Sequence, residues 1–109
     1  MTGKRFYYET ISRDLIVYPT DRDGIKPSGH RVRIPSNTID FIRDEIRKVG
    51  EIAMGACRDN PSPASLGERL RQQHKSPQFL CYVIPLLTEE RFCTPFKEGR
   101  GYVIRYTGP

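Results

Sequence analysis

One amphipathic stretch constrains the fold of this chain more than any other segment. Its apolar residues recur at spacings of three and four, which places them on one face of an α-helix: Ile39, Ile42, Ile46, Val49 and Ala53. We predict a helix from Asn37 to near Arg58, with Asn37 as its N-cap and Asp40 reaching back as in a capping box. The prolines of the following segment 59–63 cannot continue a helix.

The residues before this helix have the composition of β-strands. Phe6–Ile11 is rich in aromatic and β-branched side chains, and Asp14–Tyr18 is a short apolar run, so Ser12-Arg13 is predicted to connect a hairpin. Residues 30–34 alternate polar and apolar, so Val32 and Ile34 are expected to face a core, with Arg31 and Arg33 toward solvent. The turn-rich segment 19–29 separates the two parts. We therefore predict a small N-terminal antiparallel sheet of two or three strands.

Two shorter helices are expected after the long one. Ser65-Leu66-Gly67-Glu68 is a capping box that starts a second helix, whose pattern stops at His74. Ser76-Pro77 starts a third, since serine caps well and proline suits the first helical position. We expect its buried stripe to be Leu80, Val83 or Ile84, and Leu87, and we expect Pro85 to bend it. Gly55 is expected to let a neighbouring backbone approach.

Two strands are expected to close the chain. Arg91–Phe96 and Tyr102–Tyr106 flank the glycine-containing segment Lys97–Gly101 and predict a hairpin. Pro95 cannot donate a ladder hydrogen bond, so its strand should lie at a sheet edge. The whole chain of 109 residues is too short for two independent cores, and we predict one α+β domain.

The order of elements from Asn37 to Tyr106 resembles the winged helix-turn-helix superfamily. The resemblance rests on Ser65-Leu66-Gly67-Glu68-Arg69-Leu70 at the second helix, on Ser76-Pro77-Gln78 at the third, and on the hairpin 91–106 as the wing. It covers residues 37–106 and leaves residues 1–35 as an additional strand region. The chain departs from the common pattern at Arg91, where glycine is frequent, and at Pro85 inside the third helix.

The resemblance implies a DNA-binding protein, acting as a transcriptional regulator through the third helix and the wing. Gln78 is then the base reader, because its amide can pair with adenine. The contacts to the DNA backbone are expected from Lys75, Ser76 and Tyr82, from Lys97 and Arg100 at the wing, and from Arg31 and Arg33. Double-stranded DNA is the expected partner, and a homodimer would span two half-sites.

A second interpretation stays open, in which the third helix binds protein. That helix has almost no charge, and Phe79, Tyr82 and Pro85 are expected to be exposed on it. An exposed apolar helix face more often meets a protein partner, so a winged-helix adaptor that does not bind DNA is the alternative.

Composition excludes several other classes. The net charge of +5 permits phosphate binding without demanding it. Motifs for metal, nucleotide or hydrolytic chemistry are absent, so we expect no enzyme, no cofactor and no metal. Three cysteines at unpaired spacing indicate free thiols in a reducing compartment. With no membrane span and no signal peptide expected, we predict a cytoplasmic protein.

Overall fold

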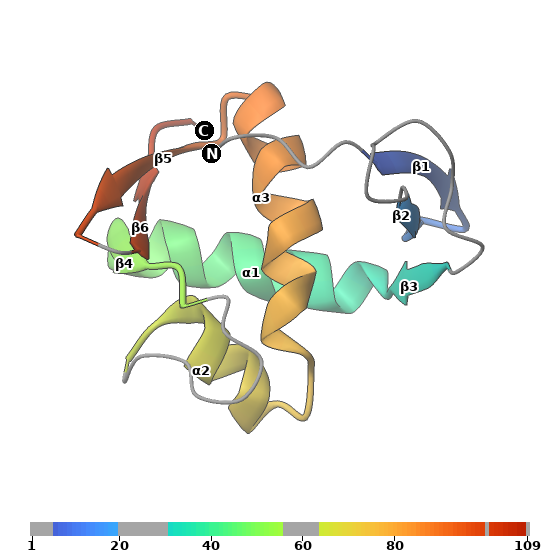
Figure 1. Ribbon diagram of the computed structural model, residues 1–109, viewed down its shortest axis with the longest axis horizontal. Coiled ribbons are helices and arrows are strands. Elements are labelled where there is room, and N and C mark those ends of the chain that lie inside the picture. The colour runs from blue at the N-terminus through green and yellow to red at the C-terminus, as the bar shows by residue number, and fades with distance from the viewer. Residues whose placement is uncertain (1–5, 20–30, 56–63, 100, 109) are drawn as a thin grey trace. The chain divides into compact units, whose positions relative to one another are not determined.

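The computed structural model describes residues 6–19, 31–55, 64–99 and 101–108, and it shows a mixed α+β architecture with three α-helices and two small antiparallel sheets (Figure 1). In chain order the elements are β1 (Phe6–Ile11), β2 (Asp14–Pro19), β3 (Val32–Ile34), α1 (Ser36–Val49), β4 (Glu51–Ala53), α2 (Leu66–Gln72), the 3-10 helix η1 (Pro77–Phe79), α3 (Leu80–Glu89), β5 (Cys93–Glu98) and β6 (Gly101–Tyr106). They fall into two units, residues 2–40 and 41–109, which are described separately.

The N-terminal unit is a three-stranded antiparallel sheet in the order β1-β2-β3. The predicted hairpin is confirmed, with Ile11 opposite Asp14 and only Ser12 and Arg13 between the strands. Both turn residues have positive φ, 51° and 73°, as a type I′ turn requires. Neither residue is glycine or asparagine, so this turn stores backbone strain.

The core of this sheet lies on its central strand. Leu15, Ile16 and Val17 of β2 are buried, and Ile34 of β3 is fully buried beside them. Val32 is half-buried and Arg33 is exposed, which confirms the predicted alternation in β3. Every residue of β1 after Phe6 is exposed, so burial falls from the centre of the sheet to the β1 edge.

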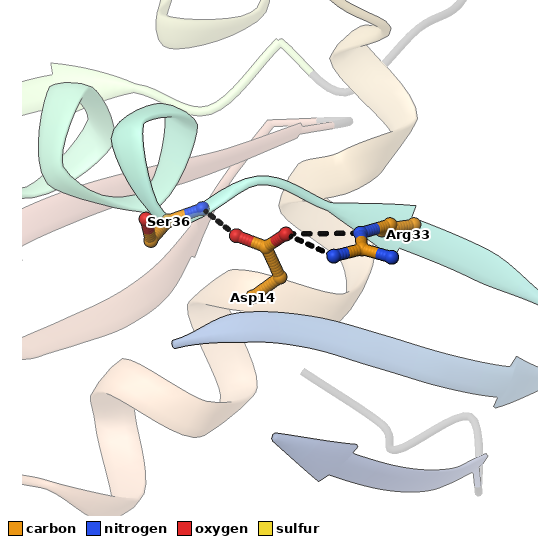
Figure 2. A network of polar contacts seen from close by, with 3 residues as sticks. All are labelled: Asp14, Arg33 and Ser36. Atoms are coloured by element: carbon orange, nitrogen blue, oxygen red, sulfur yellow. Dashed lines mark hydrogen bonds and ion pairs between the residues drawn. The ribbon is translucent and has the colours of Figure 1, made fainter. Parts of the chain in front are cut away.

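Asp14 ties this sheet to the start of α1, as Figure 2 shows. Its Oδ1 accepts a hydrogen bond of 2.8 Å from the backbone N–H of Ser36. Its Oδ2 accepts bonds of 2.9 and 2.7 Å from Nε and Nη2 of Arg33. The Ser36 bond and then the Arg33 guanidinium lower the pKa of the Asp14 carboxyl.

The predicted cap of α1 is therefore wrong. The helix begins at Ser36, so Asn37 lies inside its first turn, where its Oδ1 accepts a bond from the Thr38 hydroxyl. A carboxylate from a neighbouring strand satisfies a free N–H at the start of the helix and interacts favourably with its positive end. A capping side chain distant in sequence leaves no local motif to recognise.

The predicted C-terminal end of α1 is also wrong. The helix ends at Val49, and Gly50 follows with φ of 85°, its N–H bonded to the Ile46 carbonyl at 2.8 Å. This is the left-handed cap that commonly stops a helix. The chain then extends into β4, where Ile52 is buried and Ala53 is exposed.

The second and third helices begin as predicted. The Ser65 hydroxyl accepts a bond of 3.1 Å from the Glu68 N–H, and the Ser76 hydroxyl accepts one of 3.2 Å from the Gln78 N–H. The segment after Ser76 is a turn of 3-10 helix before it becomes α3, which contains Pro85. The predicted apolar positions are all buried: Leu66, Leu70, Leu80, Val83, Ile84 and Leu87.

Two glycines let α2 approach the end of β4. The Gly67 N–H donates to the Met54 carbonyl at 2.9 Å. A Cβ on Gly67 would lie 1.7 Å from the carbonyl oxygen of Gly55, and a Cβ on Gly55 would lie 2.1 Å from the Ser65 hydroxyl. The close approach expected at Gly55 is confirmed.

The second sheet has the order β4-β6-β5, all antiparallel. Pro95 lies on β5, an edge strand, as predicted. The C-terminal hairpin, predicted as a wing, differs from the prediction because β5 runs to Glu98, which pairs with Gly101. Lys97 therefore lies within β5 opposite Tyr102 rather than in a loop, and the turn is two residues long.

Candidate nucleic-acid interface

The segment between α2 and α3 is held by a specific helix-end motif. The Lys75 N–H bonds to the Leu70 carbonyl and the His74 N–H bonds to the Arg71 carbonyl, both at 2.9 Å. These are the two bonds of a Schellman motif, with His74 at the left-handed position and φ of 59°. Glycine is the usual residue there, so His74 occupies a position where its side chain costs backbone energy.

Residues 71–78, which we call the polar turn, contain no carboxylate. Arg71, Gln72, Gln73, His74 and Gln78 are exposed in it. Lys75 and Ser76 are half-buried, while Pro77 is buried. The exposed groups are a guanidinium, an imidazole and three amides. Such groups donate to phosphate oxygens, and amides also read base edges.

Most of the arginines that the structure describes already form ion pairs. The pairs are Arg33–Asp14, Arg43–Glu90, Arg47–Asp44, Arg69–Glu45, Arg71–Glu68 and Arg105–Glu51. Arg43 and Arg47 also lie over the ring of buried Phe92, at 5.1 and 5.4 Å from its centroid. Arg43 and Arg69, whose side chains are about one-third exposed, are engaged most fully in the fold, and the more exposed pairs contribute less.

Two candidate lysines differ from this pattern. Within residues 6–19, 31–55, 64–99 and 101–108, neither Lys75 nor Lys97 forms an ion pair. Arg71 pairs with Glu68 at 3.4 Å and its side chain is 58% exposed, so that pair is weak and easily exchanged. Phosphate binding at the polar turn would therefore break no strong interaction.

The structure brings together three of the predicted site residues. Lys75, Ser76 and Gln78 are adjacent at the start of η1, and Gln78 is exposed. The Ser76 hydroxyl already accepts the Gln78 N–H, so its first role is to cap the helix. Lys97 is exposed on β5 beside Glu98, which weakens the local positive charge. Arg100 lies outside the described residues.

The two predicted arginines of the N-terminal sheet differ in availability. Arg31 is exposed, whereas Arg33 donates two hydrogen bonds to Asp14. A guanidinium held in this way contributes less to a phosphate contact than a free one, because the existing pair must first be broken.

The body of α3 does not present the apolar surface that the sequence predicts. Phe79, Tyr82 and Pro85 are half-buried rather than exposed, and burial raises the pKa of the Tyr82 hydroxyl. The prediction failed because α3 is apolar on all sides, and such helices are normally covered. Tyr82 is therefore a poor candidate for a direct phosphate contact.

Four exposed residues of the polar turn were missed from the sequence: Arg71, Gln72, Gln73 and His74. They lie at a helix end, whereas the sequence analysis searched the start of the following helix. The available signal was the absence of carboxylates over residues 71–78, in a chain with 13 acidic residues among 109.

Other kinds of site find no support in the part of the chain that the structure describes. Those residues contain no group of three or more His, Cys, Asp or Glu side chains able to hold a metal ion. Cys93 is buried, and burial raises the pKa of its thiol, which makes it a weak nucleophile. None of the described helices has the length and apolar character needed to span a membrane.

Comparisons with protein-family models, with curated proteins and with solved structures gave no significant match. The functional argument therefore rests on the chain's own residues.

Proposed function

We propose that the chain binds double-stranded DNA through the polar turn, residues 71–78, as a regulator of transcription. The observation that carries this proposal is that eight consecutive residues at a helix-turn-helix junction contain no carboxylate and expose Arg71, His74 and three glutamines. The element order α1, β4, α2, α3, β5, β6 supports the resemblance to winged helix-turn-helix proteins.

Each residue of the polar turn has a distinct role in this proposal. Gln78, exposed in the first turn after the Ser76 cap, reads a base edge through its amide. Lys75 and Arg71 neutralise phosphates, and the His74 imidazole donates a further hydrogen bond. Lys97 on β5 adds a phosphate contact from the hairpin. Arg31, which is exposed in the N-terminal unit, is a separate candidate for a phosphate contact.

A matched pair of lysine variants tests the proposal. Fluorescence anisotropy of a labelled random-sequence duplex measures affinity at about 50 and 200 mM salt. Lys75→Ala should weaken binding and lower the salt slope by about one, because one phosphate contact is lost. Lys48→Ala removes the same charge from the last turn of α1, where the side chain is exposed. It should change binding much less.

Three outcomes of this titration would contradict the proposal. One is the absence of binding by the unaltered chain at the lower salt concentration. Another is an equal effect of Lys75→Ala and Lys48→Ala, which would indicate attraction by net charge alone. The third is binding whose affinity does not depend on salt.

Recognition of the DNA sequence is tested separately, at Gln78. Gln78→Ala should change which duplexes are preferred, with a loss of about 1–3 kcal/mol on the best site and little change on random DNA. Site selection with both proteins gives this comparison directly. An unchanged preference would remove Gln78 from the base-reading role.

The protein-adaptor alternative has less support. It depended on an exposed apolar face of α3, and the side chains of that face are half-buried. The large apolar side chains that are exposed in the described part of the chain lie elsewhere, at Tyr7, Tyr8, Ile11 and Val49.

A further inference from the structure

His74 lies in a strained backbone conformation at the end of α2. Its φ of 59° falls in the left-handed region, where a Schellman motif normally has glycine. Among the described residues, five besides glycine have positive φ, and His74 is the only one of them whose side chain changes its charge near neutral pH. Strained positions of this kind cluster at functional sites, so the conformation points to a role for the imidazole itself.

The imidazole of His74 is available to bind a ligand. The residue is exposed, and its backbone N–H is bonded to the Arg71 carbonyl at 2.9 Å. Across the part of the chain that the structure describes, no side chain forms a hydrogen bond or an ion pair with its ring. A ligand that binds this ring therefore displaces no group of the protein.

The charged groups on the elements around His74 favour an anion as that ligand. The charged residues of α2 and of the segment that joins it to η1 are Glu68, Arg69, Arg71 and Lys75. Glu68 and Arg69 are already paired, with Arg71 and with Glu45 of α1. The 3-10 helix η1, which packs against α2, has no charged residue, and α3 has none before Glu89 at its end. Arg71 and Lys75 therefore flank His74 without a free carboxylate among them.

We propose that the protonated form of His74 is the form that binds DNA, so that binding takes up a proton and strengthens as the pH falls below neutrality. This inference rests on the proposed function and adds regulation by pH to the same site. A neutral imidazole donates one hydrogen bond, whereas an imidazolium donates from both ring nitrogens. Its bonds to a phosphate oxygen are also charge-assisted, which makes them stronger.

Proton uptake and DNA binding strengthen each other. If protonation tightens DNA binding by some factor, bound DNA tightens proton binding by the same factor. Histidine changes its charge between about pH 5 and 8, so affinity should rise from the upper to the lower end of this range. The pKa of the Asp14 carboxyl is lowered and that of the Cys93 thiol is raised, so both keep their charge over the same range.

Two histidine variants test the proposal, because the chain has only His30 and His74. Anisotropy of a labelled duplex at about 50 mM salt should show binding at least about threefold tighter at about pH 5.8 than at about pH 7.8. The salt slope should be steeper by about one at the lower pH. His74→Asn should remove both differences, and asparagine tolerates the left-handed conformation. His30→Asn is the matched control and should retain both.

Proton NMR of the imidazole rings tests the proposal without a change at His74. In His30→Asn a single histidine signal remains, and it reports the charge of His74. The midpoint of its titration should move to higher pH when the duplex is added, because bound phosphates favour the imidazolium. Circular dichroism at both pH values verifies that each variant is folded.

The possible failures are distinguishable. Absence of DNA binding at both pH values would overturn the proposed function and this inference together. Binding of equal affinity at the two pH values would overturn the inference alone. It would also be overturned by a pH dependence that persists in His74→Asn or disappears in His30→Asn, and by a midpoint that the duplex does not move.

Discussion

The two sheets differ most at their exposed edge strands. Both β1 and β5 are six residues long and lie at the edge of a three-stranded sheet. β5 has Pro95 and Lys97, which oppose pairing with another strand, whereas β1 has tyrosines and one carboxylate. The two edges therefore differ in composition: β5 has a proline and a lysine that oppose strand pairing, and β1 has neither.

The polar turn and β1 also differ in charge. The polar turn, residues 71–78, lacks carboxylates and has basic and amide side chains, whereas β1 has Glu9 and no base. A DNA contact favours basic and amide side chains over carboxylates. The proposed DNA contact at residues 71–78 rests on this difference in charge.

The largest expected effect is at Gly67. Gly67→Ala would force a Cβ to within 1.7 Å of the Gly55 carbonyl oxygen, and neither backbone can move without disturbing the end of β4. We expect a loss of about 3 kcal/mol or more in the free energy of unfolding. Gly101→Ala is the control, because nothing lies within 4 Å of its Cβ position. Equal losses in urea denaturation would show that the α2–β4 contact is unimportant.

Lowering the pH is expected to have a smaller effect, a loss of stability in the N-terminal sheet. The lowered pKa of Asp14 means that its ionised form stabilises the fold. That contribution is present above the unfolded pKa near 3.8 and is lost as pH falls through the lowered folded value. The protection factors of the amide hydrogens in β2 and β3 should therefore fall on acidification more than those in β5 and β6. In Asp14→Asn this difference should disappear, and its persistence would assign the acid sensitivity to another group.

Two helix ends provide a matched comparison of stability with binding. His74 and Arg91 both occupy left-handed positions, with φ of 59° and 62°, after α2 and α3. His74→Gly and Arg91→Gly should each stabilise the chain by about 1 kcal/mol, because glycine adopts this conformation without strain. Only His74→Gly should also weaken DNA binding in the anisotropy titration. Equal affinities of the two variants would remove His74 from the interface.

The smallest effect is expected at the β1–β2 turn. Ser12→Asn with Arg13→Gly gives the pair that a type I′ turn prefers, and it should raise the midpoint of thermal unfolding by an amount equivalent to about 0.5–1 kcal/mol. The turn after β5 already has Gly99 at φ of 62°. Destabilisation by the double change would mean that Arg13 has a structural role beyond the turn.

Local chemistry made much of the fold predictable. Ser65 and Ser76 cap helices through their own hydroxyl groups, and Pro77 fixes the first turn after Ser76. The apolar spacing of Leu66 with Leu70, and of Leu80 with Leu87, identified the buried faces. These signals succeed because both partners of each interaction lie within a few residues of each other.

The errors arose where distant or competing interactions decide the structure. Asp14 caps α1 from another strand, and no pattern near Asn37 records this. Gly50 ends α1 although Ala53 continues the apolar spacing, because the β4–β6 ladder replaces the last helical turns. In the candidate site, Gln78 and Lys75 were predicted from the helix start, whereas His74 was recognised from its exposure and its left-handed backbone conformation in the structure.

The most direct test of the division between the two regions is an amide chemical-shift titration of the isotope-labelled full chain with a short DNA duplex at about 50 mM salt. The account predicts that the shifts concentrate at residues 71–78, with a smaller response at Lys97 and none along β1. An absence of shifts would contradict DNA binding. Shifts centred on Phe6–Ile11 would contradict the assignment of DNA binding to residues 71–78.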